Sequence, residues 1–149
     1  MALSVFALPN VVVGPLLRSP LRGLVSGSLL LVTVTGRKTG RRFTFPVLYA
    51  KDGRDIVIVA GWASKKTWWK NVIGGADVEL LIGTETVRGR ATAFVDDPVE
   101  RGRGLRAYLK RFPASAKTLG AGKDFRAMDD ATLGATQGDA VVVRFVPAS

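Results

Sequence analysis

The sequence of 149 residues predicts an α+β fold, built around a small barrel of about six mostly antiparallel strands. Short runs rich in β-branched residues alternate with glycine-containing turns, which is typical of antiparallel strands. The turns between the first three runs are too short for the crossovers that parallel strands need. A helix is expected between the third and fourth strands, and further helices before the last strand. Residues 1–149 are therefore expected to form a single domain.

The first part of the chain predicts an arm followed by three strands. Residues 1–25 are an apolar N-terminal arm, which Pro9 and Pro20 interrupt. Strands are predicted over residues 28–35, 42–50 and 55–60. The Asp-Gly pair at Asp52 and Gly53 supplies the turn before the third strand.

The second part predicts one helix and a hairpin, and then a longer helical region. Ser64 is a suitable N-cap for a helix over residues 65–73, and Gly74 suits its end. Residues 78–82 and 86–95 predict a hairpin around Gly83.

Asp97 followed by Pro98 predicts the start of a helix that runs to about Phe112. Residues 114–130 predict more irregular helix, and residues 140–146 a closing strand.

The composition favours an anionic partner, because 22 lysines and arginines face 12 acidic residues and the net charge is +10. The sequence contains no cysteine and no histidine. This excludes disulfides, Cys/His zinc sites and nucleophiles that rely on a thiolate or a histidine base. The acidic residues are scattered, so no metal site is predicted. An enzyme of this composition is expected to take its chemistry from a cofactor.

The hydropathy pattern predicts a cytoplasmic protein. No apolar run reaches the roughly 18 residues of a transmembrane helix, and no cationic segment precedes the apolar start of the chain. The N-terminal arm is expected to pack on the domain, with peripheral contact to a membrane as the alternative.

The first candidate site is the turn from Gly36 to Arg42, between two predicted strands. It carries four cations within six residues, Arg37 and Lys38 among them. Guanidinium groups bind phosphate and carboxylate through paired hydrogen bonds. The Thr39 hydroxyl and the backbone amides of the turn, including those of its glycines, are expected to complete a cradle for an anion. The alternative is a solvated hairpin tip.

The second candidate is the segment over residues 61–71, which holds all three tryptophans of the chain. Small residues beside a strand end let a flat ring approach the backbone. Lys65 lies at the start of the predicted helix, where free amides favour an anion. Of Trp68 and Trp69, one is expected to face the core and the other a groove. The alternative is that the tryptophans only anchor the helix.

Two further interpretations involve aromatic residues. Tyr108 and Phe112 share one helical face, which favours core packing, with a hydrogen bond from Tyr108 to a substrate as the alternative. Phe43, Phe45 and Tyr49 could stack single-stranded nucleic acid. No RRM signature is present, and nucleic-acid binding is the less favoured function.

The order of these motifs resembles the deazaflavin-dependent nitroreductase and quinone reductase family, within the split β-barrel flavin-binding superfamily. The resemblance rests on residues 29–40, on Pro46 ahead of Tyr49, on residues 57–60, and on the Trp-Trp-Lys-Asn run at residues 68–71. It implies a split barrel that binds coenzyme F-420, an 8-hydroxy-5-deazaflavin with a phosphate and an oligoglutamate tail. FMN is the less favoured cofactor. The reduced coenzyme would pass a hydride to a quinone, a nitroaromatic or a related small-molecule acceptor.

The resemblance also implies roles for residues, with the tail held by the cationic turn and the ring lined by the tryptophan segment. The implied cofactor contacts are Arg37, Lys38, Thr39, Pro46, Gly61, Trp62, Ala63, Ser64, Lys65, Trp68 and Asn71, and the expected substrate contacts are Tyr49 and Tyr108. No side chain is expected to act as a catalytic group, because the cofactor carries the hydride. A homodimer is expected, since many split barrels pair through their sheet faces. The alternative is a non-catalytic split barrel that binds a flavin-like cofactor or a fatty acid.

Overall fold

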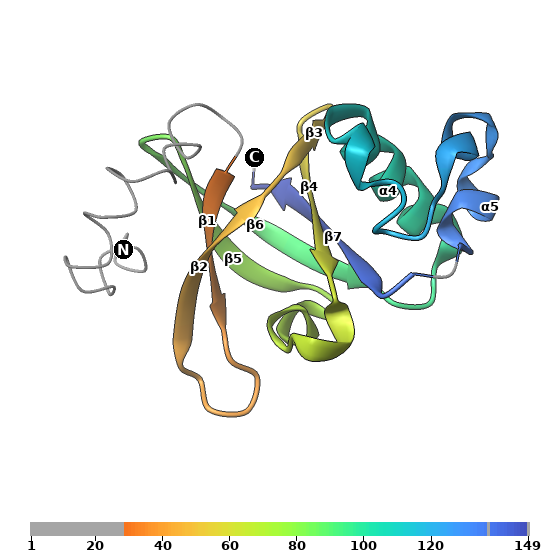
Figure 1. Ribbon diagram of the computed structural model, residues 1–149. Helices are drawn as coiled ribbons and strands as arrows, with labels where there is room; N and C mark the ends of the chain where they lie inside the picture. Colours follow the sequence, from red (N-terminus) through yellow and green to blue (C-terminus); the bar gives the residue numbers. More distant parts are fainter. Residues whose placement is uncertain (1–28, 137, 149) are drawn as a thin grey trace.

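The fold is a curled antiparallel sheet with helices against one of its faces (Figure 1). The structure, a computed structural model, describes residues 29–136 and 138–148. In these residues seven strands follow the order β2-β1-β5-β6-β7-β4-β3. The strands are β1 (Leu29–Thr35), β2 (Arg42–Leu48), β3 (Ala50–Asp52), β4 (Asp55–Gly61), β5 (Ala76–Ile82), β6 (Glu85–Phe94) and β7 (Ala140–Pro147). The helices are α4 (Pro98–Arg111) and α5 (Asp130–Gly134), with short 3-10 helices η2 (Ala63–Lys65), η3 (Trp68–Val72), η4 (Pro113–Ser115) and η5 (Lys123–Ala127).

The predicted barrel is confirmed, with seven strands in the described residues where about six were expected. The predicted strand over residues 42–50 is divided at Tyr49. Its first part pairs with β1, from Arg42 opposite Thr35 to Leu48 opposite Leu29. Beyond Tyr49 the chain pairs with β4 instead. A single extended segment therefore passes from one edge of the sheet to the other, which curls the sheet into a barrel.

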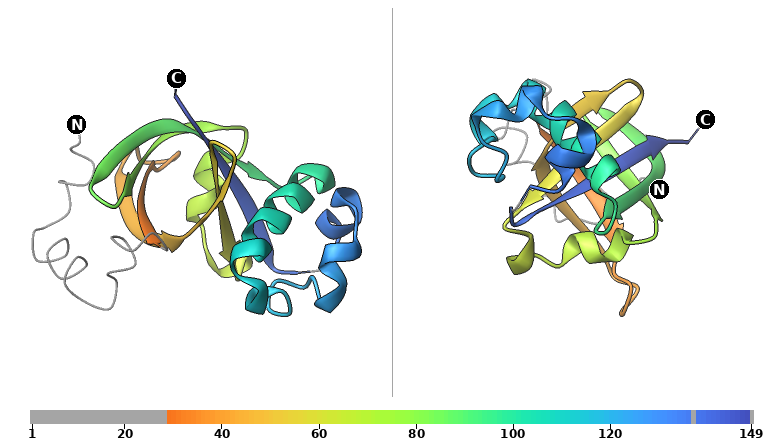
Figure 2. Two further views of the ribbon diagram at one scale, coloured as in Figure 1. Left: turned by 90° about the horizontal axis from the view of Figure 1, so that it is seen from above. Right: turned by 90° about the vertical axis from the view of Figure 1, so that its right-hand side faces the viewer.

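Two hydrophobic clusters lie on opposite faces of β4 and β7. Ile56, Ile58 and Phe145 belong to the cluster inside the barrel. Val57 and Val142 belong to a second cluster, beneath α4 and the segments that follow it. Successive side chains of a strand point to opposite faces, so a strand covered on both sides is apolar at nearly every position. Figure 2 shows α4 and α5 packed together beside the sheet.

The helix predicted after Asp97 is confirmed. The Asp97 carboxylate accepts a hydrogen bond from the Glu100 amide at 3.1 Å, and Pro98 occupies the first turn. Gly102 lets α5 approach closely, because a Cβ at this position would lie 1.8 Å from the carbonyl oxygen of Asp130. The helix ends at Arg111, ahead of Pro113, as the sequence indicates.

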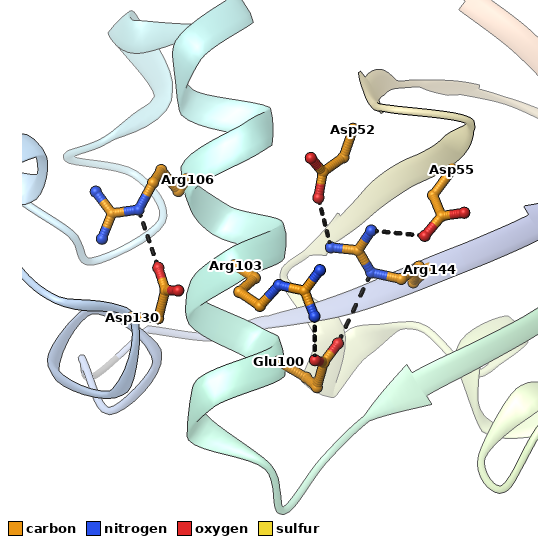
Figure 3. Close-up of polar contacts among 7 residues, drawn as sticks. All are labelled: Asp52, Asp55, Glu100, Arg103, Arg106, Asp130 and Arg144. Carbon is orange, nitrogen blue, oxygen red and sulfur yellow. Dashed lines mark hydrogen bonds and ion pairs between the residues drawn. The ribbon is translucent and has the colours of Figure 1, made fainter.

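A buried arginine ties three elements together (Figure 3). Arg144 of β7 is 6% exposed and donates to Asp52 at 2.9 Å and to Asp55 at 3.0 Å, on either side of the β3–β4 turn. Its Nε lies 3.8 Å from Glu100 of α4. Burial acts to lower the pKa of Arg144, but the hydrogen bonds to the two aspartates outweigh it and the pKa is raised. Both acids of the Asp-Gly turn therefore serve the fold.

The helix predicted between the third and fourth strands is present as a helical segment, but it is not the continuous helix expected over residues 65–73. The chain forms η2, opens into extended backbone at Lys66, and then forms η3. Gly74 and Gly75 end this segment with positive φ, as expected from glycine after a helical turn. The predicted N-terminal arm, residues 1–25, lies outside the described residues. Within those residues no helix has both the length and the apolar content to cross a bilayer.

Candidate functional site

The cationic turn and the tryptophan segment lie at the same end of the barrel. In Figure 1 and in the right-hand view of Figure 2, the β1–β2 turn and the chain between β4 and β5 both emerge at the lower end of the barrel. The amide of Arg37 donates to Asn71 Oδ1 at 2.9 Å, and Asn71 Nδ2 donates to the carbonyl of Trp68 at 3.1 Å. The Trp68 ring in turn packs on Phe45 of β2, with centroids 5.1 Å apart. Two segments separated by about thirty residues thus become one surface.

The backbone of the turn is largely closed on itself. The Gly36 amide donates to the carbonyl of Arg41 at 2.7 Å, and the Gly40 amide donates to the carbonyl of Gly36 at 2.9 Å. The Thr39 hydroxyl accepts from the Arg41 amide at 3.2 Å. The amides of Gly36 and Gly40 are therefore used within the turn and are not available to an anion. The Lys38 and Thr39 amides donate to no atom in the described part of the chain.

Trp62 is the most exposed aromatic residue of the segment. Its side chain is 62% exposed, and its φ of 51° and ψ of 45° place it in the left-handed region. Among the described residues it is the one non-glycine residue with positive φ. Such a conformation costs about 1–2 kcal/mol, so the surrounding contacts must hold it. Strained backbone of this kind is concentrated at functional sites.

The residues after Trp62 are held by Asp139, which precedes β7. The amide of Ala63 donates to the Asp139 carbonyl at 3.1 Å. The Ser64 amide donates to Asp139 Oδ1 at 2.8 Å, and the Ser64 hydroxyl donates to Oδ2 at 2.5 Å. Ser64 therefore does not cap a helix, and the expected free amides of a helix N-terminus are wrong.

Asp139 is a residue that the sequence did not single out. The hydrogen bond from the Ser64 hydroxyl, followed by that from the Ser64 amide, lowers the pKa of its carboxyl, and the charge of Lys65 acts in the same direction. The local sequence shows only an acidic residue shortly before a strand. Its partner Ser64 follows β4, so the contact could be predicted only by knowing that β4 and β7 lie side by side.

Trp68 and Trp69 are both half-buried, and both pack against the barrel core. The Trp69 indole donates to the Ala63 carbonyl at 3.0 Å. The Lys70 ammonium lies 5.6 Å from the centroid of the Trp69 ring. The expected division, with one ring in a groove, is not seen; Trp62 is the exposed ring.

The two tyrosines assigned to substrate are buried. Tyr49 is 3% exposed, and the Arg111 guanidinium lies 4.9 Å from its ring centroid. Tyr108 is 6% exposed and packs on Phe112, and burial raises its pKa. Both residues serve packing as the structure has them, and their assignment as substrate contacts stays a prediction. Of the three aromatic residues considered for stacking nucleic-acid bases, Tyr49 is buried, Phe45 is half-buried and Phe43 is exposed.

Pro46 and Gly61, two of the implied cofactor contacts, lie on different strands of the sheet. Pro46 is exposed on the edge strand β2, opposite Leu31 of β1. Because side chains alternate along a strand, Pro46 points to the other face from Phe45. Gly61 is the last residue of β4, opposite Ala140. Of these two positions, only Gly61 adjoins Trp62.

The two segments that form this end carry charge of one sign, and Asp139 lies beside them. Residues 36–42 and 61–75 contain no acidic residue and seven cations. One of the seven, Arg42, pairs with Glu79 at 3.5 Å. The other six have no carboxylate within ion-pair distance in the described residues: Arg37, Lys38, Arg41, Lys65, Lys66 and Lys70. The described residues also hold no group of three acids that could bind a metal. The surface therefore suits a multiply charged anion.

The fold is that of the split β-barrel proteins. A solved F420-H2 dependent reductase, FDR-A, superimposes with a TM-score of 0.55 at 17% identity, over 79% of this chain and 93% of that chain. The heme storage protein HutZ from Vibrio cholerae superimposes with a TM-score of 0.51 at 11% identity, over 89% of this chain and 91% of that chain. At these identities the likeness concerns the fold alone, and one fold carries several functions.

The sequence assigns the chain to a family within this class. Residues 19–114 match the model of the F420H(2)-dependent quinone reductase family, and the chain belongs to that family. A protein of Mycobacterium tuberculosis named "Putative F420H(2)-dependent quinone reductase" is 32% identical over 77 residues. That match covers 50% of this chain and 63% of the relative.

Proposed function

We propose that this protein is an oxidoreductase that binds coenzyme F-420 at the lower end of the barrel and reduces a quinone, a nitroaromatic or a related acceptor. The observation that carries the proposal is the hydrogen bond from the Arg37 amide to Asn71. It joins the cationic turn to the segment that exposes Trp62. A coenzyme with a flat ring, a phosphate and several carboxylates requires an aromatic surface and a cationic surface side by side.

The residues present fit this group. The six cations without acidic partners match the charges of the phosphate and the glutamates. The free amides of Lys38 and Thr39 supply donors beside two exposed cationic side chains, which is the geometry that binds phosphate. Trp62 and Gly61 supply a ring and a position without a side chain, where a planar ring can stack.

When bound, the reduced coenzyme supplies a hydride and a proton, which together convert a quinone into its quinol. The protein itself binds and orients the coenzyme and the acceptor, and it excludes water from them. Arg37 and Lys38 hold the anionic tail, and Trp62 covers the ring. Holding donor and acceptor in contact lowers the entropic barrier to hydride transfer without a side-chain acid or base. The absence of histidine and cysteine from the sequence is compatible with such chemistry.

Two measurements test the proposal. Oxidised coenzyme F-420 is titrated against the tryptophan fluorescence of the purified protein, with FMN as the comparison. Reduced coenzyme is then mixed with menadione, and the visible absorbance of the oxidised coenzyme is followed. Saturable quenching by F-420 and turnover with menadione would support the proposal. Binding without turnover on any quinone or nitroarene would favour a non-catalytic binder, and no binding would refute the proposal.

The proposal extends to location and assembly. The protein is proposed to be cytoplasmic and to act on a small-molecule acceptor. A homodimer belongs to the same proposal, and sedimentation velocity of the full chain tests it. A monomer at concentrations where the protein is active would refute the dimer and leave the redox proposal standing.

A further inference from the structure

We infer that Asp139 is a positioning residue of the coenzyme site, which fixes the backbone at residues 62–64 so that Trp62 presents its ring to the ligand. The inference rests on the proposed function, and it adds a residue that no comparison assigns. An acidic residue beside a site for a polyanion repels the ligand, so its presence there indicates that its charge serves another purpose. The hydrogen bonds to Ser64 supply that purpose.

The first step of the argument is the conformation of Trp62. The backbone of Trp62 lies in the left-handed region, which is unfavourable for a residue with a large side chain, and the exposed ring makes few contacts that could stabilise it. The next two residues are bound from both sides. Asp139 accepts three hydrogen bonds from Ala63 and Ser64, and the Trp69 indole donates to the Ala63 carbonyl. These contacts determine where the backbone leaves Trp62.

The second step is that Asp139 is itself held rigidly. Arg101 of α4 donates to the carbonyl of Ala140 at 3.2 Å, to that of Thr136 at 3.1 Å and to that of Gly134 at 2.8 Å. One guanidinium therefore binds carbonyls on both sides of Asp139 in the chain. The position of Asp139 is set by α4 and by the β4–β7 pairing, and Asp139 transmits that position to Ser64.

The third step is that the chain offers a matched control. Asp129, the N-cap of α5, is an exposed aspartate that accepts a hydrogen bond from the Thr132 amide at 2.7 Å. Its pKa is lowered by the backbone and side-chain hydrogen bonds of Thr132, much as the pKa of Asp139 is lowered by Ser64. Removing either carboxylate removes similar interactions, but only Asp139 contacts the tryptophan segment.

The experiment compares Asp139→Ala, Asp139→Asn and Asp129→Ala in the full chain by hydrogen exchange and by titration with oxidised coenzyme F-420. In Asp139→Ala we expect the Ser64 amide to exchange at least about tenfold faster, as follows from losing a charge-assisted hydrogen bond. The dissociation constant should rise by about the same factor. Asp139→Asn keeps an acceptor for the Ser64 amide and should stay within about threefold of the native protein. Asp129→Ala should lower the melting temperature without changing either readout.

The outcomes separate this inference from the proposed function. Native exchange at Ser64 and native affinity in Asp139→Ala would overturn the inference, as would an equal loss of affinity in Asp129→Ala. If the native protein does not bind the coenzyme, the proposed function fails and the role of Asp139 in a coenzyme site fails with it. Exchange at Ser64 then still decides whether Asp139 orders the segment.

Discussion

Replacing Asn71 with alanine is expected to separate the cationic turn from the tryptophan segment. Asn71 accepts from the Arg37 amide at 2.9 Å and donates to the Trp68 carbonyl at 3.1 Å. In the described residues, no other hydrogen bond joins residues 36–41 to residues 61–75. The whole polar connection between the two parts of the site therefore depends on one side chain.

The magnitude follows from the two hydrogen bonds. Each contributes about 1 kcal/mol net, so Asn71→Ala should lose about 2 kcal/mol of unfolding free energy. For a chain of this size that corresponds to a fall of about 4–8 °C in melting temperature. In the variant, the coenzyme must order the turn when it binds. If this reduces the binding free energy by about 1–2 kcal/mol, the dissociation constant rises by about 5- to 30-fold.

The assay combines thermal unfolding, a fluorescence titration with oxidised coenzyme F-420 and hydrogen exchange at the Arg37 amide. Asp97→Ala is the control. It removes a hydrogen bond to Glu100 at the start of α4, should cost about 1 kcal/mol of stability, and should leave affinity unchanged. The reasoning is refuted if Asn71→Ala retains both native exchange at Arg37 and native affinity.

Three further predictions concern other parts of the structure. Lys38→Ala should weaken coenzyme binding by about tenfold or more, because one charge-assisted hydrogen bond is lost. The melting temperature should not change, because the side chain is exposed. An unchanged affinity in the titration would count against the turn as the binding site. Arg144→Met should cost about 3 kcal/mol in denaturant unfolding, because it leaves two aspartates unpaired, whereas Arg103→Met at an exposed pair should cost under about 1 kcal/mol. The pKa values of Asp129 and Asp139 are lower in the folded protein than in the unfolded chain. Both carboxylates therefore stabilise the folded state at pH values above the usual carboxyl pKa. This contribution to the unfolding free energy is lost as the pH falls through the lowered pKa values. The melting temperature should therefore fall on acidification, and a double Asp→Asn variant with an equally steep acid slope would contradict this.

Much of the site's composition could be predicted from the sequence, but its contacts could not. The cationic turn is a local feature, since four cations between two strands lie at a hairpin tip in any fold with that hairpin. The glycine amides cannot contribute to the expected anion cradle, because Gly36 and Gly40 close the turn with their own amides. The expected helix after Ser64 is divided into two short 3-10 helices, because tertiary hydrogen bonds to Asp139 and from Trp69 replace a regular helical turn.

The sequence by itself determined most of the strand positions, the helix after Asp97 with its cap, and the charge of the barrel's lower end. These depend on side-chain periodicity and on residues within a few positions of one another. The tertiary structure alone decided that Asn71 binds the turn, that Ser64 binds Asp139 across 75 positions, and that Tyr49 and Tyr108 are buried. Such contacts depend on which strands become neighbours in a curled sheet, and the order β6-β7-β4 places β7 beside β4 although the two are far apart in the chain. Local secondary-structure propensity carries no information about which strands become neighbours. The strand order is set by the burial of apolar side chains on both faces of the sheet, which depends on the whole chain.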